Sequence, residues 1–239
     1  MYFVNIHTHS SNRLANEIAV QNLFPEQNEQ MNFGQTQLYS VGLHPWYTEK
    51  IKVNELAKRI LGICENKNVI AVGEIGIDKN RGAEIDIQLK LFETQAQIGN
   101  ELNKPVIIHC VKGFNEILSL RKKLKPKVDW IFHGFVQNAE IAKQCIDLGC
   151  KLSFGKALLN TGSSVRSVFQ SVPDESYFIE TDEGNSIEEI YQAAAQIKNI
   201  SIQKLQEIQW LNFNECFKVQ QNEYIQRLDA AYRAANRSK

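Results

Sequence analysis

The sequence begins MYFVNIHTHSS and places His7 and His9 one residue apart, directly after an apolar run. Such a run predicts a β-strand, and residues i and i+2 of a strand point to the same face. The two imidazoles are therefore expected to converge. Convergent imidazoles suit a divalent ion such as zinc, manganese, iron or nickel, although histidine pairs near strand ends also serve as surface or packing residues.

The three remaining histidines of the chain follow apolar runs of the same kind. His44 occurs in VGLHPW, His109 in PVIIHC and His133 in WIFHGF. All five histidines are thus expected at the C-terminal ends of strands. Histidines placed for packing would be spread over helices and loops, so this placement favours a shared site.

Two carboxylates follow apolar runs as well, Glu74 in AVGEIGID and Asp182 in YFIETDEGN. A carboxylate at the end of a buried strand is costly unless something positive meets it, and a metal ion would do so. Other interpretations remain open for each. Glu74 could form a salt bridge with Lys79 or Arg81, and Asp182 could cap a helix that begins near Ile187.

The elements that must position these residues alternate along the chain. Short runs of β-branched and aromatic residues predict strands at 2–6, 18–24, 38–43, 69–72, 106–108, 130–132, 151–154 and 177–179. Amphipathic patterns predict helices at 53–65, 85–102, 114–124, 139–148, 164–171, 187–198, 202–217 and 223–234.

This alternation predicts α/β architecture with parallel strands, and eight strands favour a (β/α)8 TIM barrel over an open doubly wound sheet. The first connection is irregular, because residues 10–17 are too few for a full crossover helix. Residues 1–239 are expected to form a single domain with its metal site at the C-terminal rim of the barrel.

The composition narrows the class of protein. There are 27 acidic and 27 basic residues, which argues against a protein held on nucleic acid by bulk charge. The five cysteines are scattered without a CxxC pair and are expected to be reduced and mostly buried. No signal peptide or membrane-spanning run is recognisable, so we expect a cytoplasmic monomer that does not bind a membrane.

The motifs taken together resemble the TatD-type metal-dependent hydrolases, the TatD DNases of the amidohydrolase superfamily. The resemblance runs over nearly the whole chain in the motifs NIHTH, VGLHP, GEIGID, KPVIIH, FHGF, LSFG, ETD and NFNECF. It implies a distorted (β/α)8 barrel that holds one or two divalent metal ions, with zinc, manganese, magnesium, iron and nickel all open.

The resemblance also implies roles for individual residues. His7, His9 and Asp182 would bind a first metal, Glu74 would bridge two metals, and His109 and His133 would bind the second. Glu74 and Asp182 would then be catalytic, with Asp182 accepting the proton of the attacking water. His44 would lie beside the substrate.

The sequence departs from the family pattern mainly where substrate would bind. Asn5 replaces an aspartate two residues before the first histidine, and the arginine of the family's H-x-R motif is absent after His109. Lys112 is the nearest cation and is the expected substrate-binding replacement, although lysine lacks the bidentate fork of arginine. The loop after ETD also lacks the family's A-P-Y and R-N-E-P segments.

Three functions remain open at this point. The first is a metal-dependent phosphodiesterase, a deoxyribonuclease acting on single-stranded DNA or another phosphoester. The second is an amidohydrolase or lactonase acting on a small carbonyl substrate, which needs no phosphate fork. The third is a non-catalytic barrel whose metal is structural, which predicts a closed set of ligands.

Overall fold

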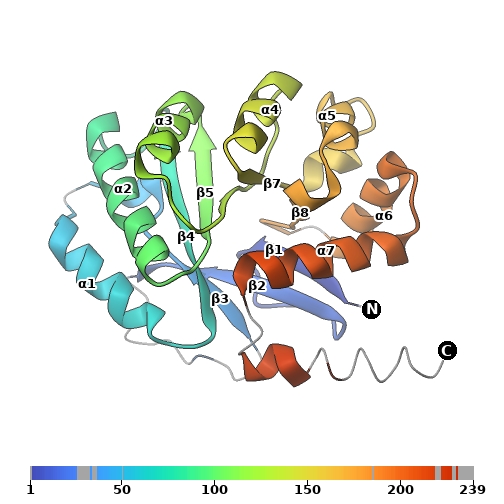
Figure 1. The fold of residues 1–239 in the computed structure, drawn as a ribbon, viewed down its shortest axis with the longest axis horizontal. Helices are drawn as coiled ribbons and strands as arrows, with labels where there is room; N and C mark the ends of the chain where they lie inside the picture. Colours follow the sequence, from blue (N-terminus) through green and yellow to red (C-terminus); the bar gives the residue numbers. More distant parts are fainter. Residues whose placement is uncertain are drawn as a thin grey trace.

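Eight parallel strands form one sheet in chain order in the computed structural model, which describes residues 2–25, 33, 37–49, 51–184, 186–218, 222–227 and 230 (Figure 1). The strands are β1 (Phe3–Thr8), β2 (Glu17–Leu23), β3 (Leu38–Val41), β4 (Val69–Asp78), β5 (Val106–Val111), β6 (Trp130–Phe132), β7 (Cys150–Phe154) and β8 (Tyr177–Ile179). An isolated bridge between Thr8 and Asp182 nearly closes the sheet into a barrel. The predicted fold class, a distorted (β/α)8 barrel, is confirmed.

Helices flank the strands as the amphipathic patterns predict (Figure 1). They are α1 (Val53–Cys64), α2 (Ile85–Glu101), α3 (Phe114–Leu124), α4 (Ala139–Asp147), α5 (Val165–Ser171), α6 (Ile187–Lys198) and α7 (Ile202–Phe217), with short 3-10 turns η2 (Pro45–Tyr47), η3 (Lys156–Leu159) and η4 (Asp174–Ser176). Residues 223–227 and 230 of the eighth predicted helix are helical, and the rest of it lies outside the described residues.

Strand β3 ends at Val41, two residues before its predicted end, and three other strands run past their predicted ends. Strand β1 extends to Thr8, β4 continues from 72 to Asp78, and β5 continues from 108 to Val111. The added residues carry glycine, glutamate and histidine, which usually mark a strand end, but each strand gains hydrogen bonds from its neighbour. Glu74 therefore lies inside β4 and His109 inside β5, so these two side chains are fixed by sheet pairing.

Two apolar clusters hold the barrel together. The larger one packs the strands against α1 to α6 and the N-terminal half of α7, and it includes Phe92, Trp130 and Tyr177. The smaller one joins strand residues such as Val4 and Ile107 to the C-terminal half of α7. Burial of this apolar surface is the main stabilising contribution to the fold.

All five cysteines are free thiols, as expected from their spacing. Cys64, Cys145, Cys150 and Cys216 are buried, and Cys110 is half-buried. Burial raises the pKa of the Cys110 thiol to about 12, so this neighbour of His109 stays protonated at neutral pH. Among the described residues, no helix is both long enough and apolar enough to span a membrane.

Replacing Ser201 with alanine is expected to lower the free energy of unfolding by about 1 kcal/mol. The Ser201 hydroxyl caps α7 by accepting a hydrogen bond from the Lys204 N–H at 3.1 Å. Ser164 occupies the same position before α5 but makes no capping bond with its side chain, so Ser164→Ala is the matched control. Urea denaturation of both variants measures the difference, and equal losses would contradict the capping role.

Candidate metal centre

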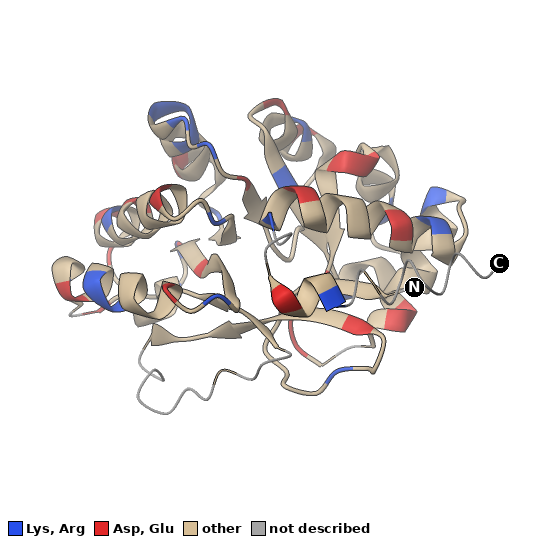
Figure 2. Cartoon of the chain, turned by 60° about the horizontal axis from the view of Figure 1, so that its bottom comes forward, with Lys and Arg blue, Asp and Glu red and all other residues tan. Residues whose placement is uncertain are grey.

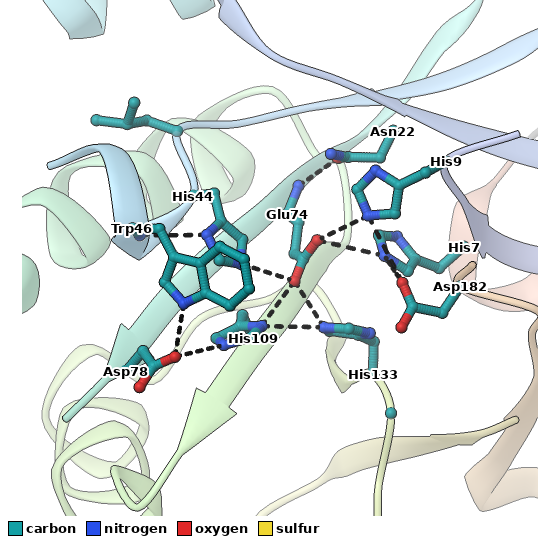
Figure 3. A network of polar contacts seen from close by, with 12 residues as sticks. His7, His9, Asn22, His44, Trp46, Glu74, Asp78, His109, His133 and Asp182 are labelled. Carbon is teal, nitrogen blue, oxygen red and sulfur yellow. Dashed lines mark hydrogen bonds and ion pairs between the residues drawn. The ribbon is translucent and has the colours of Figure 1, made fainter. Parts of the chain in front are cut away.

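Glu74 lies at the centre of the candidate site, with its side chain only 3% exposed (Figure 3). All five histidines of the chain approach its two carboxylate oxygens. The nearest ring nitrogens lie at 3.3 Å for His7 and 3.4 Å for His9 from Oε2, and at 2.7 Å for His133, 2.8 Å for His109 and 3.2 Å for His44 from Oε1. Histidines from four separate segments of the sequence, one of which supplies both His7 and His9, therefore meet at one carboxylate.

The local structure of β4 explains how Glu74 reaches this position. The pairing of β4 with β5 shifts register between Val72 and Ile75, and an irregularity of this kind can re-aim a side chain. The Glu74 N–H donates to Asn22 Oδ1 at 2.6 Å. Close packing requires glycine at 73 and 76. A Cβ on Gly73 would lie 2.7 Å from the Ile107 side chain, and a Cβ on Gly76 would lie 1.9 Å from the His109 carbonyl oxygen.

Asp182 is fixed beside the first two histidines by its backbone. Its N–H donates to the His7 carbonyl at 3.1 Å, and its carbonyl accepts from the His9 N–H at 3.0 Å. Oδ1 then lies 3.7 Å from His7 Nε2 and 3.6 Å from His9 Nε2, with the side chain 34% exposed. The alternative role as a helix cap is taken by Ser186, whose hydroxyl accepts from the Glu189 N–H.

Two further carboxylates contact the outer nitrogens of His109 and His133. His109 Nε2 lies 3.4 Å from Asp78 Oδ2, and His133 Nδ1 lies 3.4 Å from Glu180 Oε1. Glu180 is fully buried and accepts a hydrogen bond from the Gly134 N–H at 2.6 Å. Carboxylates in this position orient a metal-binding imidazole and raise its basicity. The sequence reasoning did not identify Glu180, although it is the first residue of the ETD motif.

The electrostatic balance of the site favours an ionised Glu74. Burial alone would raise the pKa of Glu74, but His133, His109 and His44 hold it well below its usual range. Burial would likewise lower the pKa of His133, but Glu74 and Glu180 raise it well above its usual value. By contrast, burial lowers the pKa of His44, which favours a neutral imidazole at that position.

The donor atoms are close enough together to hold metal ions. Three groups have ligand atoms within 4.8 Å of one another, namely His7–His133–Asp182, His7–His9–Glu74 and His44–Glu74–His109. His44, expected beside the substrate, thus also lies among possible ligands. Both ring nitrogens of His7 are buried without a hydrogen-bond partner among the described residues, which is costly unless another partner binds there. A divalent cation with mixed nitrogen and oxygen ligands fits this site.

Lys112, the cation expected to contact substrate, contacts a loop residue of this chain. Lys112 follows β5 with a positive φ of 58°, and its Nζ donates to Asn80 Oδ1 at 3.1 Å. Lys79, proposed as an alternative partner of Glu74, pairs instead with Glu116. The structure therefore places both lysines in contacts with loop and helix residues.

Asn5, which replaces the family's aspartate, forms a buried contact beside the site. Its amide nitrogen donates to Glu17 Oε1 at 2.8 Å and to Thr181 Oγ1 at 2.9 Å. Its Oδ1 accepts from the Thr181 N–H at 3.1 Å. Asn5 therefore ties β1 to β2 and to the segment that carries Asp182.

A nearly closed parallel barrel with histidines and carboxylates gathered at one carboxylate defines a class, the barrel metal-dependent hydrolases. The family model described as TatD related DNase matches residues 22–218. The chain belongs to the TatD-related DNase family and is a metal-dependent hydrolase of that family.

Known relatives agree with this assignment, and a solved structure has the same fold. The chain is 24% identical to the uncharacterized metal-dependent hydrolase YabD of Bacillus subtilis, over 75% of this chain and 77% of the relative. It is 26% identical to the 3'-5' ssDNA/RNA exonuclease TatD of Pantoea ananatis, over 60% of this chain and 56% of the relative. The TatD homologue YjjV of Escherichia coli has the same fold, with a TM-score of 0.77 and 19% identity over 91% of this chain and 98% of that one.

Proposed function

We propose that this protein is a phosphodiesterase of the TatD type that cleaves single-stranded DNA or a related phosphoester with a metal-activated water. The observation that carries the proposal is Glu74, whose two oxygens face two separate groups of histidines. A carboxylate in this position can bridge two cations. The exonuclease activity named for the Pantoea relative supports nucleic acid as the substrate class.

The ligands divide between the two oxygens of Glu74. His7, His9 and Asp182 would hold one ion, and His109 and His133 would hold the other. The Asp78 and Glu180 carboxylates behind His109 and His133 support this division, because both rings are held from outside. The identity of the ion stays open among zinc, manganese, magnesium, iron and nickel, and one ion or two would satisfy the ligands.

When bound, a divalent ion lowers the pKa of a water ligand from near 16 to about 7. The residues of this chain would supply the remaining functions. The Asp182 carboxylate is one-third exposed and lies beside His7 and His9, so it can accept a proton from water at this edge. His44 Nδ1 accepts from the Trp46 N–H at 3.2 Å, so neutral His44 carries its proton on Nε2, beside Glu74 Oε1, and can donate it in a hydrogen bond to substrate.

Charge on the rest of the molecule gives little attraction for a polyanion. Lysine, arginine and the acidic residues are interspersed over the helices (Figure 2), and the formal net charge is zero. A phosphodiester must therefore be held by a few residues near the metal centre, among which Lys112 stays a candidate.

A metal-dependent amidohydrolase or lactonase is the second candidate. It is favoured by Cys110 and Val111, which follow His109 where the family carries an arginine. A structural, non-catalytic metal is less well supported, because His9 and Asp182 are 28% and 34% exposed and leave the ligand set open to solvent.

Metal removal and restoration tests the proposal. Protein stripped of metal is expected to lose cleavage of 5′-labelled single-stranded DNA and to regain it with Mn²⁺, Mg²⁺ or Zn²⁺. Asp182→Asn is the control, because it keeps the shape of the side chain and removes the proton acceptor. Metal-loaded protein that leaves DNA intact but hydrolyses a lactone or an amide would favour the second candidate.

A further inference from the structure

Arg81 belongs to the loop between β4 and α2, and its guanidinium lies on the ring of Trp46. The Arg81 Cζ is 3.9 Å from the centroid of that ring. Among the described residues, no carboxylate is paired with this guanidinium. Lys79, in the same loop, pairs with Glu116, and Lys112, which follows β5, donates to Asn80 of that loop. Arg81 therefore carries an unpaired positive charge.

Trp46 connects this charge to the candidate metal centre. The Trp46 Nε1–H donates to Asp78 Oδ2 at 2.6 Å, and the same oxygen lies 3.4 Å from His109 Nε2 (Figure 3). The rings of Trp46 and His109 are also in contact, with centroids 6.0 Å apart. Trp46 thus touches both the guanidinium of Arg81 and a candidate metal ligand.

The backbone of the Arg81 loop is held firmly by Gln88, which is 2% exposed. The Gln88 amide nitrogen donates to the carbonyls of Asp78, Arg81 and Ala83 at 3.0, 2.9 and 2.7 Å. Gly82, with a φ of +86°, packs so closely on the Pro45 carbonyl oxygen that a Cβ would lie 2.0 Å from it. The loop is therefore docked onto the turn that carries Trp46.

We infer that Arg81 binds the phosphate of the substrate, in place of the arginine that the H-x-R position lacks. The inference rests on the proposed phosphodiesterase function. A guanidinium whose flat face lies on an aromatic ring keeps its in-plane N–H donors available for a ligand. Two of these donors match two phosphate oxygens. The docked loop and Trp46 hold this donor fork in place before substrate arrives, which limits the entropy lost on binding.

The test compares Arg81→Gln with Arg59→Gln, an exposed arginine on α1, in the metal-loaded protein. Cleavage of a 5′-labelled oligothymidylate gives KM and kcat, and fluorescence anisotropy gives the dissociation constant without turnover. Arg81→Gln is expected to raise KM and the dissociation constant by roughly 10- to 100-fold with a smaller change in kcat. Arg59→Gln is expected to match the wild-type protein.

Arg81→Lys separates the donor fork from the charge alone. It is expected to recover only part of the affinity, and full recovery would overturn the bidentate contact. If the wild-type protein cleaves the oligonucleotide and Arg81→Gln behaves like Arg59→Gln, the role of Arg81 is overturned while the proposed function stands.

The same experiments also detect a failure of the proposed phosphodiesterase function. If the wild-type protein binds the oligonucleotide but cleaves it with none of the metals, the phosphodiesterase proposal is removed. Weaker binding of the oligonucleotide by Arg81→Gln would then still support the contact between Arg81 and the phosphate. An oligonucleotide that is neither bound nor cleaved by the wild-type protein overturns both.

Discussion

Replacing Glu74 with glutamine is expected to lower kcat/KM by roughly a thousandfold or more, since metal ions contribute several kcal/mol of transition-state stabilisation. Glutamine keeps the size of the side chain but replaces one oxygen with an NH2 group, which cannot bind a cation. In the structure each Glu74 oxygen has histidines of its own, so either orientation of the amide removes an oxygen from one group.

The measurement is hydrolysis by Glu74→Gln beside the number of metal ions retained per chain. Glu74→Gln is expected to retain fewer metal ions than the wild-type protein and to remain folded, as measured by circular dichroism. Glu65→Gln, an exposed glutamate that follows α1, controls for the loss of one negative charge. Wild-type activity in Glu74→Gln would remove Glu74 from the reaction and with it the bridging role.

The sequence was most informative where a residue type is scarce and its position in a strand is simple. His7 and His9 follow one apolar run, and alternation in a strand is enough to predict that they point the same way. Both do reach Oε2 of Glu74. The family motifs then placed the remaining histidines near the same carboxylate, and the barrel brings them there.

The sequence was less informative where pairing with a neighbour overrides local preference. The segment GEIGID looks like a strand end because of its glycines and charges, yet β4 continues through it along β5. Gly76 pairs with His109 there, which brings the two motifs together. That contact depends on the register between two strands about thirty residues apart, and no single run of sequence encodes it.

The sequence also did not predict which individual carboxylates are buried. In ETD, Asp182 was recognised from the motif, whereas Glu180 was not singled out. Only the folded chain shows that Glu180 is fully buried against His133 and Gly134. The expectations of a single domain and a monomer stay predictions.

Replacing Glu180 with glutamine is expected to weaken metal binding by roughly 10- to 100-fold, the usual effect of removing a carboxylate behind a ligating histidine. Burial, the largest effect, lowers the pKa of His133, whereas Glu74 and then Glu180 raise it. The Glu180 carboxylate thereby makes this imidazole a better electron donor. Glutamine can still accept the Gly134 hydrogen bond. The loss should therefore appear in the dissociation constant of Zn²⁺ or Mn²⁺, measured against a competing chelator.

Glu17→Gln is the matched control, because Glu17 is also a buried carboxylate but contacts Asn5 and the Leu14 N–H instead of a histidine. Both substitutions remove a buried charge and are expected to lower the free energy of unfolding, by an amount that urea denaturation measures. Only Glu180→Gln should also weaken metal binding. Unchanged metal affinity in Glu180→Gln would mean that the carboxylate merely fills the core behind His133, and the ring would then have to be positioned by packing alone.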